Sequence, residues 1–228
     1  MSIYAIGDLH LSNSVNKPMH VFGAAWEQHD QRIANAWLDT VKETDIVLLP
    51  GDFSWAMHVD DARADFAYLH ELPGKKIMIR GNHDYWWNSA TKIRALLPPS
   101  VSIIQNDSLS VGDIHIGGTR GWACPGSSGF TSADEKLYLR ECARLDLSIN
   151  KLPADGLRIV LLHYPPFNEK WESSAFSERV KAAKIDIVVY GHLHGRSCRG
   201  AFEGVRDGTA YHLVSADHVG FCPKRIHE

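Results

Sequence analysis

Short, almost wholly apolar runs recur along the chain, and such runs are typical of strands buried on both faces of a sheet. Five of them are rich in isoleucine and valine and span residues 3–6, 46–49, 77–79, 159–162 and 185–189. Three more polar runs, at 101–105, 114–117 and 211–214, predict strands with one wetter face. The pattern therefore predicts a sheet core whose central strands are covered on both sides.

The segments between these runs carry apolar residues at helical spacing. One stripe consists of Ile33, Trp37 and Val41, and Trp26 is assigned to the same kind of helical face. A second helix is predicted from Ser132, which with Glu135 reads as a capping box. The remaining helical stripes are Tyr138, Cys142, Leu145 and Ile149, Phe66 and Leu69, Ile93 and Leu97, and Phe176 and Val180. Strands that alternate with helices predict an α/β protein with all helices outside the sheets.

Composition narrows the class of protein further. The chain has 228 residues, 44% hydrophobic and 22% charged, and no evident linker, so we expect a single domain over residues 1–228. A formal net charge of −3 disfavours a broad nucleic-acid surface but permits a small anionic substrate at a metal site. No apolar run approaches a membrane span and no secretory signal is visible, so we expect a cytoplasmic protein. Its four scattered cysteines are expected to be reduced thiols.

Five short polar motifs each follow one of the apolar runs. They are Asp8-Leu9-His10, Gly51-Asp52, Gly81-Asn82-His83-Asp84, His163 and Gly191-His192-Leu193-His194. In open α/β sheets, ligands collect beyond the carboxyl ends of the strands, so residues distant in sequence are expected to converge there. Each motif alone is also compatible with an ordinary turn. Together they supply carboxylates, a carboxamide and imidazoles, a set that suits a pair of divalent metals and hence phosphate ester hydrolysis.

This ordered set resembles the calcineurin-like metallophosphoesterases, whose blocks run Asp-x-His, Gly-Asp, Gly-Asn-His-Asp/Glu, His and Gly-His-x-His. The match covers residues 8–194, and every block is complete. The resemblance implies a four-layer α/β/β/α sandwich of two mixed sheets flanked by helices, with a two-metal site at one edge. It implies a first metal held by Asp8, His10, Asp52 and His194, and a second held by Asp52, Asn82, His163 and His192. It also implies that His83 acts on the substrate and that Asp84 orients His83.

These implied roles make physical sense. Two divalent ions need an anionic bridge, which Asp52 can supply, and the residual positive charge attracts a phosphoryl group. A water between the ions would ionise near neutral pH and attack phosphorus, while His83 would protonate the leaving group as a general acid. The mixed donor set accommodates Mn²⁺, Fe²⁺/Fe³⁺, Zn²⁺ or Co²⁺ without selecting among them.

The second block departs from the serine/threonine protein phosphatases of the same superfamily, which continue it as Gly-Asp-x-x-Asp-Arg-Gly. Residues 51–57 here read Gly-Asp-Phe-Ser-Trp-Ala-Met, so the Asp-Arg pair is absent and protein phosphatase activity is disfavoured.

Candidates for substrate binding surround the motifs. Trp55, Trp86 and Trp87 are candidates for an aromatic rim that stacks on a flat leaving group, and Trp86 and Trp87 are equally compatible with packing loops against the sheets. Arg120 is a candidate phosphate contact, and Arg80 either reaches the site or forms a salt bridge. The segment 13–23 is expected to shape the pocket.

Three functions are compatible with these motifs. The first is a bimetallic phosphohydrolase acting on a small phosphorylated substrate, with either phosphomonoesterase or phosphodiesterase activity. The second is a nuclease of the same superfamily, which the net charge of −3 disfavours without excluding it. The third is a non-catalytic scaffold on the same fold, which the complete ligand set disfavours. Substrate, metal identity and oligomeric state are not readable from the sequence.

Overall fold

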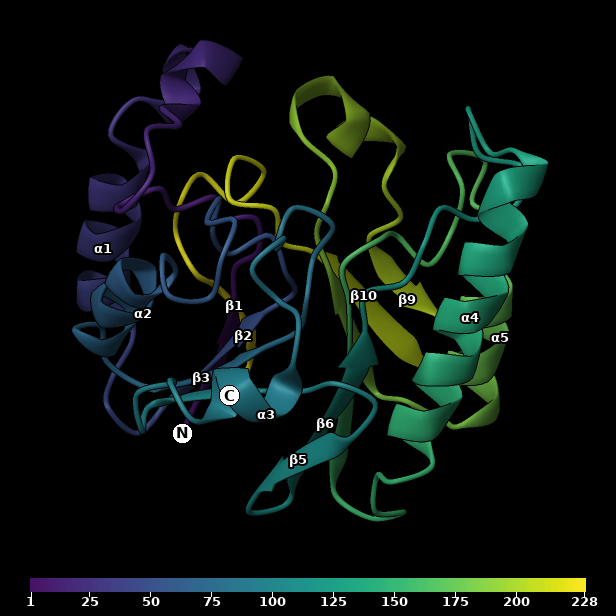
Figure 1. Cartoon of the computed structure of the whole chain (residues 1–228). Helices are drawn as coiled ribbons and strands as arrows, with labels where there is room; N and C mark the ends of the chain where they lie inside the picture. The colour runs from purple at the N-terminus through teal and green to yellow at the C-terminus, as the bar shows by residue number, and fades with distance from the viewer.

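The computed structural model describes residues 1–228 as two sheets packed face to face, with helices on both outer sides. In Figure 1 the helices α1 (His29–Thr40) and α2 (Arg63–His70) cover one outer face, and α4 (Ser132–Ile149) and α5 (Ala175–Ala182) cover the other. The short α3 (Ala90–Arg94) lies at the opposite end of the sheets from the loops of the site. This confirms the α/β/β/α sandwich of two mixed sheets.

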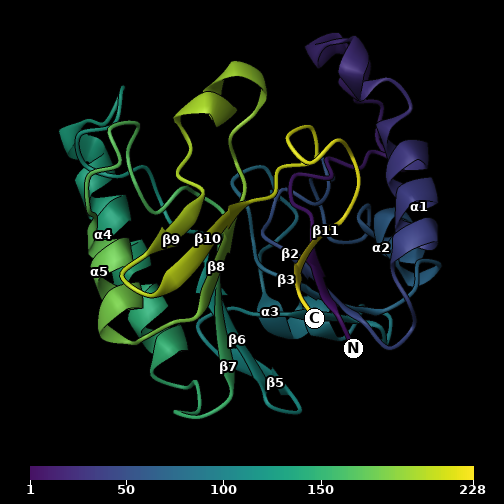
Figure 2. The ribbon, with the colours of Figure 1, turned by 180° about the vertical axis from the view of Figure 1, so that it is seen from behind.

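The first sheet has the strand order β11-β1-β2-β3-β4. Its bounds are β1 Ile3–Ala5, β2 Ile46–Leu49, β3 Lys75–Met78, β4 Val101–Ile103 and β11 Lys224–His227. Strands β1 to β4 are parallel, and β11 pairs antiparallel with β1, with Ile3 opposite His227. The two chain ends therefore lie side by side, as Figure 2 shows.

The second sheet has the order β5-β6-β7-β8-β10-β9. Its bounds are β5 Ser108–Val111, β6 Ile114–Thr119, β7 Leu157–Leu162, β8 Ile187–Tyr190, β9 Gly204–Arg206 and β10 Thr209–Leu213. The four central strands are parallel and the two edge strands antiparallel. Three 3-10 helices, η1 (Met19–Phe22), η2 (Ala24–Trp26) and η3 (Gly195–Gly200), project from the edge formed by the carboxyl ends of the parallel strands.

Alternate side chains of the central strands enter different cores, which explains why the runs read as continuously apolar. In β2, Ile46 and Leu48 pack between the two sheets, while Val47 and Leu49 pack under the helices α1 and α2. The same division in β7 places Ile159 and Leu161 between the sheets and the neighbouring side chains against α4 and α5. Burial on both faces is the pattern of internal parallel strands.

Several local predictions were wrong. The capping box of α4 is made by Thr131 and Asp134, one residue before the predicted Ser132 and Glu135, because Thr131 has the extended backbone that an N-cap requires. The strand β6 is buried along its whole length because α4 covers its outer face. Trp26 lies in η2 rather than in α1.

Other features agree with the predictions or add to them. All four cysteines are free thiols. None of the helices is both long and apolar enough to span a bilayer. The strands β5, β9 and β11 were not predicted, since each is a short edge strand with little apolar character.

Candidate metal centre

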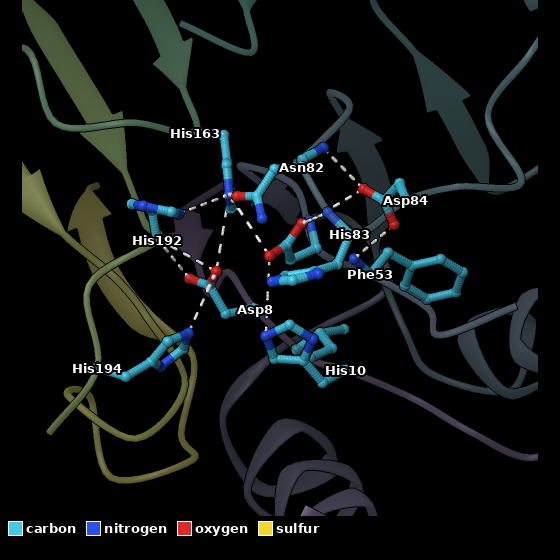
Figure 3. A network of polar contacts seen from close by, with 12 residues as sticks. Asp8, His10, Phe53, Asn82, His83, Asp84, His163, His192 and His194 are labelled. Carbon is cyan, nitrogen blue, oxygen red and sulfur yellow. Dashed lines mark hydrogen bonds and ion pairs between the residues drawn. The ribbon is translucent and has the colours of Figure 1, made fainter. Parts of the chain in front are cut away.

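The five motifs converge where the parallel strands of both sheets end. Asp8 and His10 follow β1, Asp52 follows β2, Asn82 follows β3, and the remaining histidines follow strands of the second sheet. Figure 3 shows the labelled side chains among them, Asp8, His10, Asn82, His163, His192 and His194, gathered from both sheets around one place. The set consists of Asp8, His10, Asp52, Asn82, His163, His192 and His194.

The backbone is strained at four of these positions. The φ angles are 57° at Asp8, 46° at His10, 51° at Asp52 and 73° at His192. Side chains other than glycine rarely adopt this left-handed region, and such strain is concentrated at functional sites. Each strand therefore ends in a sharp turn that aims its polar side chain into the gap between the sheets.

Two glycines make room for the carboxylates. A Cβ on Gly81 would overlap the Oδ1 atom of Asp52, and a Cβ on Gly191 would overlap the Oδ2 atom of Asp8. The glycine that precedes each of these motifs is thus required by the close approach of an acidic side chain from another motif.

Asp52 lies between histidines that come from different sheets. Its Oδ2 atom is 3.8 Å from Nε2 of His10 and 3.5 Å from Nε2 of His163. Its Oδ1 atom accepts a hydrogen bond from the backbone N–H of His83 at 2.7 Å. One oxygen thus holds the carboxylate in place while the other faces both histidines, an arrangement compatible with a bridging ligand.

Asp8 also faces more than one donor. Its Oδ1 atom is 3.7 Å from Nε2 of His194 and 3.9 Å from Nδ1 of His163, and its oxygens accept the backbone N–H of His192 at 3.1 and 3.0 Å. Asp8 belongs to both compact donor groups, one with His10 and His194 and the other with Asp52 and His163. The carboxylates therefore sit at the centre of the imidazoles.

The remaining donors gather around Nε2 of His163. This atom lies 2.6 Å from Oδ1 of Asn82 and 3.2 Å from Nδ1 of His192. The other ring nitrogen of His163 faces the carbonyl of Pro50 at 3.0 Å, and an N–H directed there leaves Nε2 with a free lone pair. Two lone-pair donors that face one another in this way are suited to a shared cation.

The electrostatics of the cluster also fit a metal. Burial lowers the pKa of His163 to about 3 and that of His192 to about 2, and it also lowers the pKa of His10. These imidazoles are therefore neutral, the form that ligates. Burial raises the pKa of Asp8 to about 8, so its ionised form needs a positive charge close by.

Asp217 is a member of the site that the sequence analysis missed. Its Oδ1 atom accepts a hydrogen bond from Nδ1 of His194 at 2.8 Å, and its Oδ2 atom accepts the backbone N–H of Gly195 at 2.8 Å. Burial disfavours charge on His194, but Asp217 and the carboxylates of Asp8 and Asp52 raise its pKa above the ordinary value. A carboxylate behind a ligating histidine fixes its tautomer and orientation.

The predicted pairing of Asp84 with the ring of His83 was wrong. The Asp84 carboxylate accepts backbone N–H groups of Gly81, Asp52 and Phe53 at 2.7 to 2.9 Å. It also accepts the backbone N–H of Ser54 at 3.2 Å and the indole Nε1–H of Trp86 at 3.1 Å. Asp84 therefore ties together the loops after β2 and β3, as Figure 3 shows, and its geometry leaves no oxygen for the His83 imidazole.

The sequence of this chain matches that of a known protein family. Residues 1–196 match the family model described as calcineurin-like phosphoesterase. The chain belongs to that family.

The chain also has a distant relative. A protein of Vesicomyosocius okutanii subsp. Calyptogena okutanii (strain HA), named a probable cyclic nucleotide phosphodiesterase, is 23% identical over 160 residues. The match covers 66% of this chain and 62% of that relative, so the chain spans less than two thirds of the relative's length.

Two solved structures share the fold. The phosphopantetheinyl hydrolase of Mycobacterium tuberculosis has a TM-score of 0.60 at 13% identity, with 99% of this chain and 95% of the other covered. A protein of unknown function from Aquifex aeolicus has a TM-score of 0.53 at 16% identity, with 98% and 95% covered.

A cavity of about 520 Å³ opens onto this cluster of carboxylates and imidazoles. Besides members of the cluster, its walls include Lys17, Met19, Phe22, Trp26, Trp55 and His83. Trp55 stacks on His10 with ring centroids 4.7 Å apart, and Trp26 meets the rings of His10 and His194 edge-on. Residues within the segment 13–23 thus line the pocket, in agreement with the prediction for that segment.

Of the two alternatives for Trp86 and Trp87, the aromatic rim is wrong and packing against the sheet is confirmed. Their side chains are 0% and 2% exposed and belong to the core under α1 and α2. Trp87 donates its indole N–H to Gln105 at 2.5 Å. The aromatic walls of the pocket are instead Trp55, which was among the candidates for the rim, and Trp26, which the sequence placed on a helical stripe.

Arg120 does not line this cavity. Its guanidinium is 3.5 Å from Oε1 of the buried Glu141 and lies over the ring of Trp122 at 4.6 Å. Its backbone carbonyl accepts the N–H of His163 at 3.0 Å. Arg120 is therefore close to the proposed metal ligands, but it lines a different cavity.

Proposed function

We propose that this protein is a metal-dependent phosphoester hydrolase that cleaves phosphomono- or phosphodiester bonds of small phosphorylated compounds. The observation that carries the proposal is the convergence of two buried carboxylates, a carboxamide and four imidazoles, three of which burial keeps neutral, at five strand ends of the two sheets. Family membership supports the same class of reaction.

The donor set divides into two overlapping groups in this proposal. One ion is held by Asp8, His10, Asp52 and His194, and the other by Asp52, Asn82, His163 and His192. Mn²⁺, Fe²⁺/Fe³⁺, Zn²⁺ and Co²⁺ all suit such mixed nitrogen and oxygen donors. When bound, the two ions supply Lewis acidity at the phosphoryl oxygens and lower the pKa of a bound water.

His83 is placed to handle the proton of the leaving group. Its ring is half-buried in the wall of the pocket, with its centroid 4.7 Å from that of Trp55 and 5.8 Å from that of His10. Its backbone N–H donates to Asp52, so the loop that carries it is fixed to a ligand. In the proposal His83 protonates the departing oxygen, and Asp84 acts only by holding the two loops together.

The walls of the pocket suit a small organic ester. Trp26, Trp55 and Met19 offer an apolar surface for the leaving group, and the ammonium of Lys17 lies 3.2 Å above the ring of Trp55. A cation beside an aromatic wall suits a flat, anionic leaving group. The relative named as a probable cyclic nucleotide phosphodiesterase is consistent with such a substrate.

The test is turnover by the purified protein. Hydrolysis of bis-p-nitrophenyl phosphate and p-nitrophenyl phosphate is measured with Mn²⁺, after chelation, and in the Asp52→Asn variant. We expect turnover that chelation removes and Mn²⁺ restores. A metal-loaded protein that turns over neither ester, nor cyclic nucleotides, dinucleotides or DNA in the same assay, would contradict the proposal.

A further inference from the structure

A second, strongly basic cavity lies beside the metal centre. It has a volume of about 250 Å³ and lies at the carboxyl ends of β3, β4 and β6, next to α4. None of the proposed metal ligands lines it, and its polar walls are Arg80, Asn88, Gln105, Arg120, Arg140 and Arg144. Asn88, Gln105 and Arg140 are exposed, so the cavity opens to solvent.

The positive charge of this arginine cavity is not balanced by the protein. Its single acidic residue is Glu141, whose side chain is fully buried. The Oε1 atom of Glu141 is shared by Arg120 at 3.5 Å, Arg140 at 3.7 Å and Arg144 at 2.7 Å, and its Oε2 atom accepts the hydroxyl of Thr119 at 2.7 Å. One carboxylate thus faces three guanidinium groups.

Arg80 adds a fourth guanidinium, and it has no ion pair and no side-chain hydrogen bond within the protein. The Nε atoms of Arg80 and Arg120 are both buried without any partner. A buried donor left unpaired is unfavourable, and more so when it is charged, so such groups ordinarily meet a ligand or ordered water.

Further donors face the same cavity. The side-chain oxygen of Gln105 is occupied by the indole N–H of Trp87 at 2.5 Å, which leaves the amide N–H groups of Gln105 free to donate. Guanidinium groups present several N–H donors in a planar fork that matches the oxygens of phosphate. The walls therefore offer hydrogen-bond donors to a ligand. Their only carboxylate, that of Glu141, is already shared by three arginines.

We propose that the arginine cavity binds a phosphate-like oxyanion as a second anion site, separate from the phosphoryl group at the metals. Two sources have this chemistry: a second phosphate carried by the substrate, and a free oxyanion that binds independently. The arginine cavity lies next to the proposed metal centre. Arg80 directly precedes Gly81 of the third motif, and the backbone carbonyl of Arg120 accepts the N–H of His163. The inference concerns binding and does not require the proposed hydrolysis.

Binding of radiolabelled sulfate to the Mn²⁺-loaded protein tests the site directly. We expect one sulfate site that persists in Asp52→Asn and weakens on the order of tenfold or more in Arg80→Gln and in Arg144→Gln, since each loses a charge-assisted hydrogen bond. Arg144 is partly exposed, so its variant is expected to fold even if Arg80→Gln does not. The matched control is Arg63→Gln on the exposed face of α2, which keeps full affinity.

Two outcomes would overturn the inference: no sulfate binding by the wild type, or binding that Asp52→Asn abolishes and Arg144→Gln leaves intact. Kinetics of the wild type then separate the two sources. Sulfate that raises the KM of adenosine 3′,5′-bisphosphate competitively in the wild type, but not in Arg144→Gln, identifies the cavity as the place of a second substrate phosphate. Sulfate that binds the cavity without competing identifies an independent oxyanion. Failure of hydrolysis itself would leave the binding result standing.

Discussion

At the scale of single residues, the side chains that carry the proposed chemistry are distinguished by their surroundings rather than by their type. The chain has thirteen histidines. His10, His163 and His194 face the two buried carboxylates, the ring of His192 faces His163, and His83 faces the pocket. Residue type and motif order were enough to predict these five, because each follows a strand whose end the sequence marks clearly.

The roles of other residues in and around the site could not be predicted from the sequence. Asp217 lies in no motif, and its role arises only because the loop after β10 brings it to His194. The sequence could not decide between a rim and a packing role for Trp86 and Trp87, because a tryptophan beside a motif packs inward or outward according to neighbours that are distant in sequence. Asp84 was correctly placed near the site, but its partners are backbone N–H groups, which no sequence pattern displays.

His83 should matter for turnover and not for metal binding. In His83→Ala we expect the metal content to be unchanged, because the ligand Asn82 and the backbone N–H to Asp52 remain. We expect hydrolysis of an ester with a poor leaving group to fall about 10²- to 10⁴-fold. Metal analysis and initial rates measure this, with the exposed His58→Ala as control. Unchanged rates would remove His83 from the mechanism.

Lys76 should make stability depend on alkaline pH. Its side chain is 1% exposed, and burial lowers its pKa from 10.5 to about 8. Between these values the unfolded chain binds more protons than the folded one, so the free energy of unfolding contributed by Lys76 rises as pH increases from 8 to 10.5. Below pH 8 Lys76 is protonated in both the folded and the unfolded chain, and the full cost of burying its charge lowers the stability of the folded state.

The substitution Lys76→Met should therefore stabilise the protein at pH 7 by about 1–2 kcal/mol and remove this contribution to the alkaline rise. Urea unfolding at pH 7 and pH 9.5 measures both effects, with the exposed neighbour Lys75→Met as control. A loss of stability at pH 7 in Lys76→Met, greater than that of the control, would contradict the expectation.

At the scale of elements, the strongly apolar strands were predictable and the edges were not. The run 46–49 coincides with β2 because both of its faces are buried. By contrast β9, Gly204–Arg206, has two exposed residues out of three and depends on pairing with β10 rather than on burial. Edge strands with little apolar surface give no periodic signal, and β5 and β11 were missed for the same reason.

The cap of α4 gives a test at this scale. Thr131 accepts the backbone N–H of Asp134, and the Asp134 carboxylate accepts the N–H of Thr131 at 2.9 Å. We expect Thr131→Ala to lower the free energy of unfolding by about 1 kcal/mol and Ser132→Ala to change it little. The free energies of unfolding of the two variants, measured by urea denaturation, show whether residue 131 or residue 132 caps the helix. A larger loss in Ser132→Ala would restore the cap predicted from the sequence.

At the scale of the whole molecule, the proposed metal centre joins the two sheets. Asp8, Asp52 and Asn82 belong to the first sheet, while His163 and the pair His192 and His194 belong to the second. Ions held by both groups would cross-link strand ends that otherwise meet through the apolar layer between the sheets. The fold class followed from the alternation of strands and helices, but the meeting of these ends required the tertiary arrangement.

Metal removal should therefore lower stability. With Mn²⁺ at about one hundred times its dissociation constant, we expect the free energy of unfolding to exceed that of the chelated protein by about 2.7 kcal/mol per site. The Asp52→Asn variant, unfolded in urea with and without Mn²⁺, should respond much less. Equal midpoints for the wild type in both conditions would show that no metal binds preferentially to the folded state.

The most direct measurement is anomalous diffraction at the manganese edge from a crystal of the Mn²⁺-loaded protein. The account predicts two peaks about 3.5–4 Å apart, with Asp52 touching both and with His10 and His163 on opposite sides. A single peak, or peaks that do not contact Asp52, would contradict it.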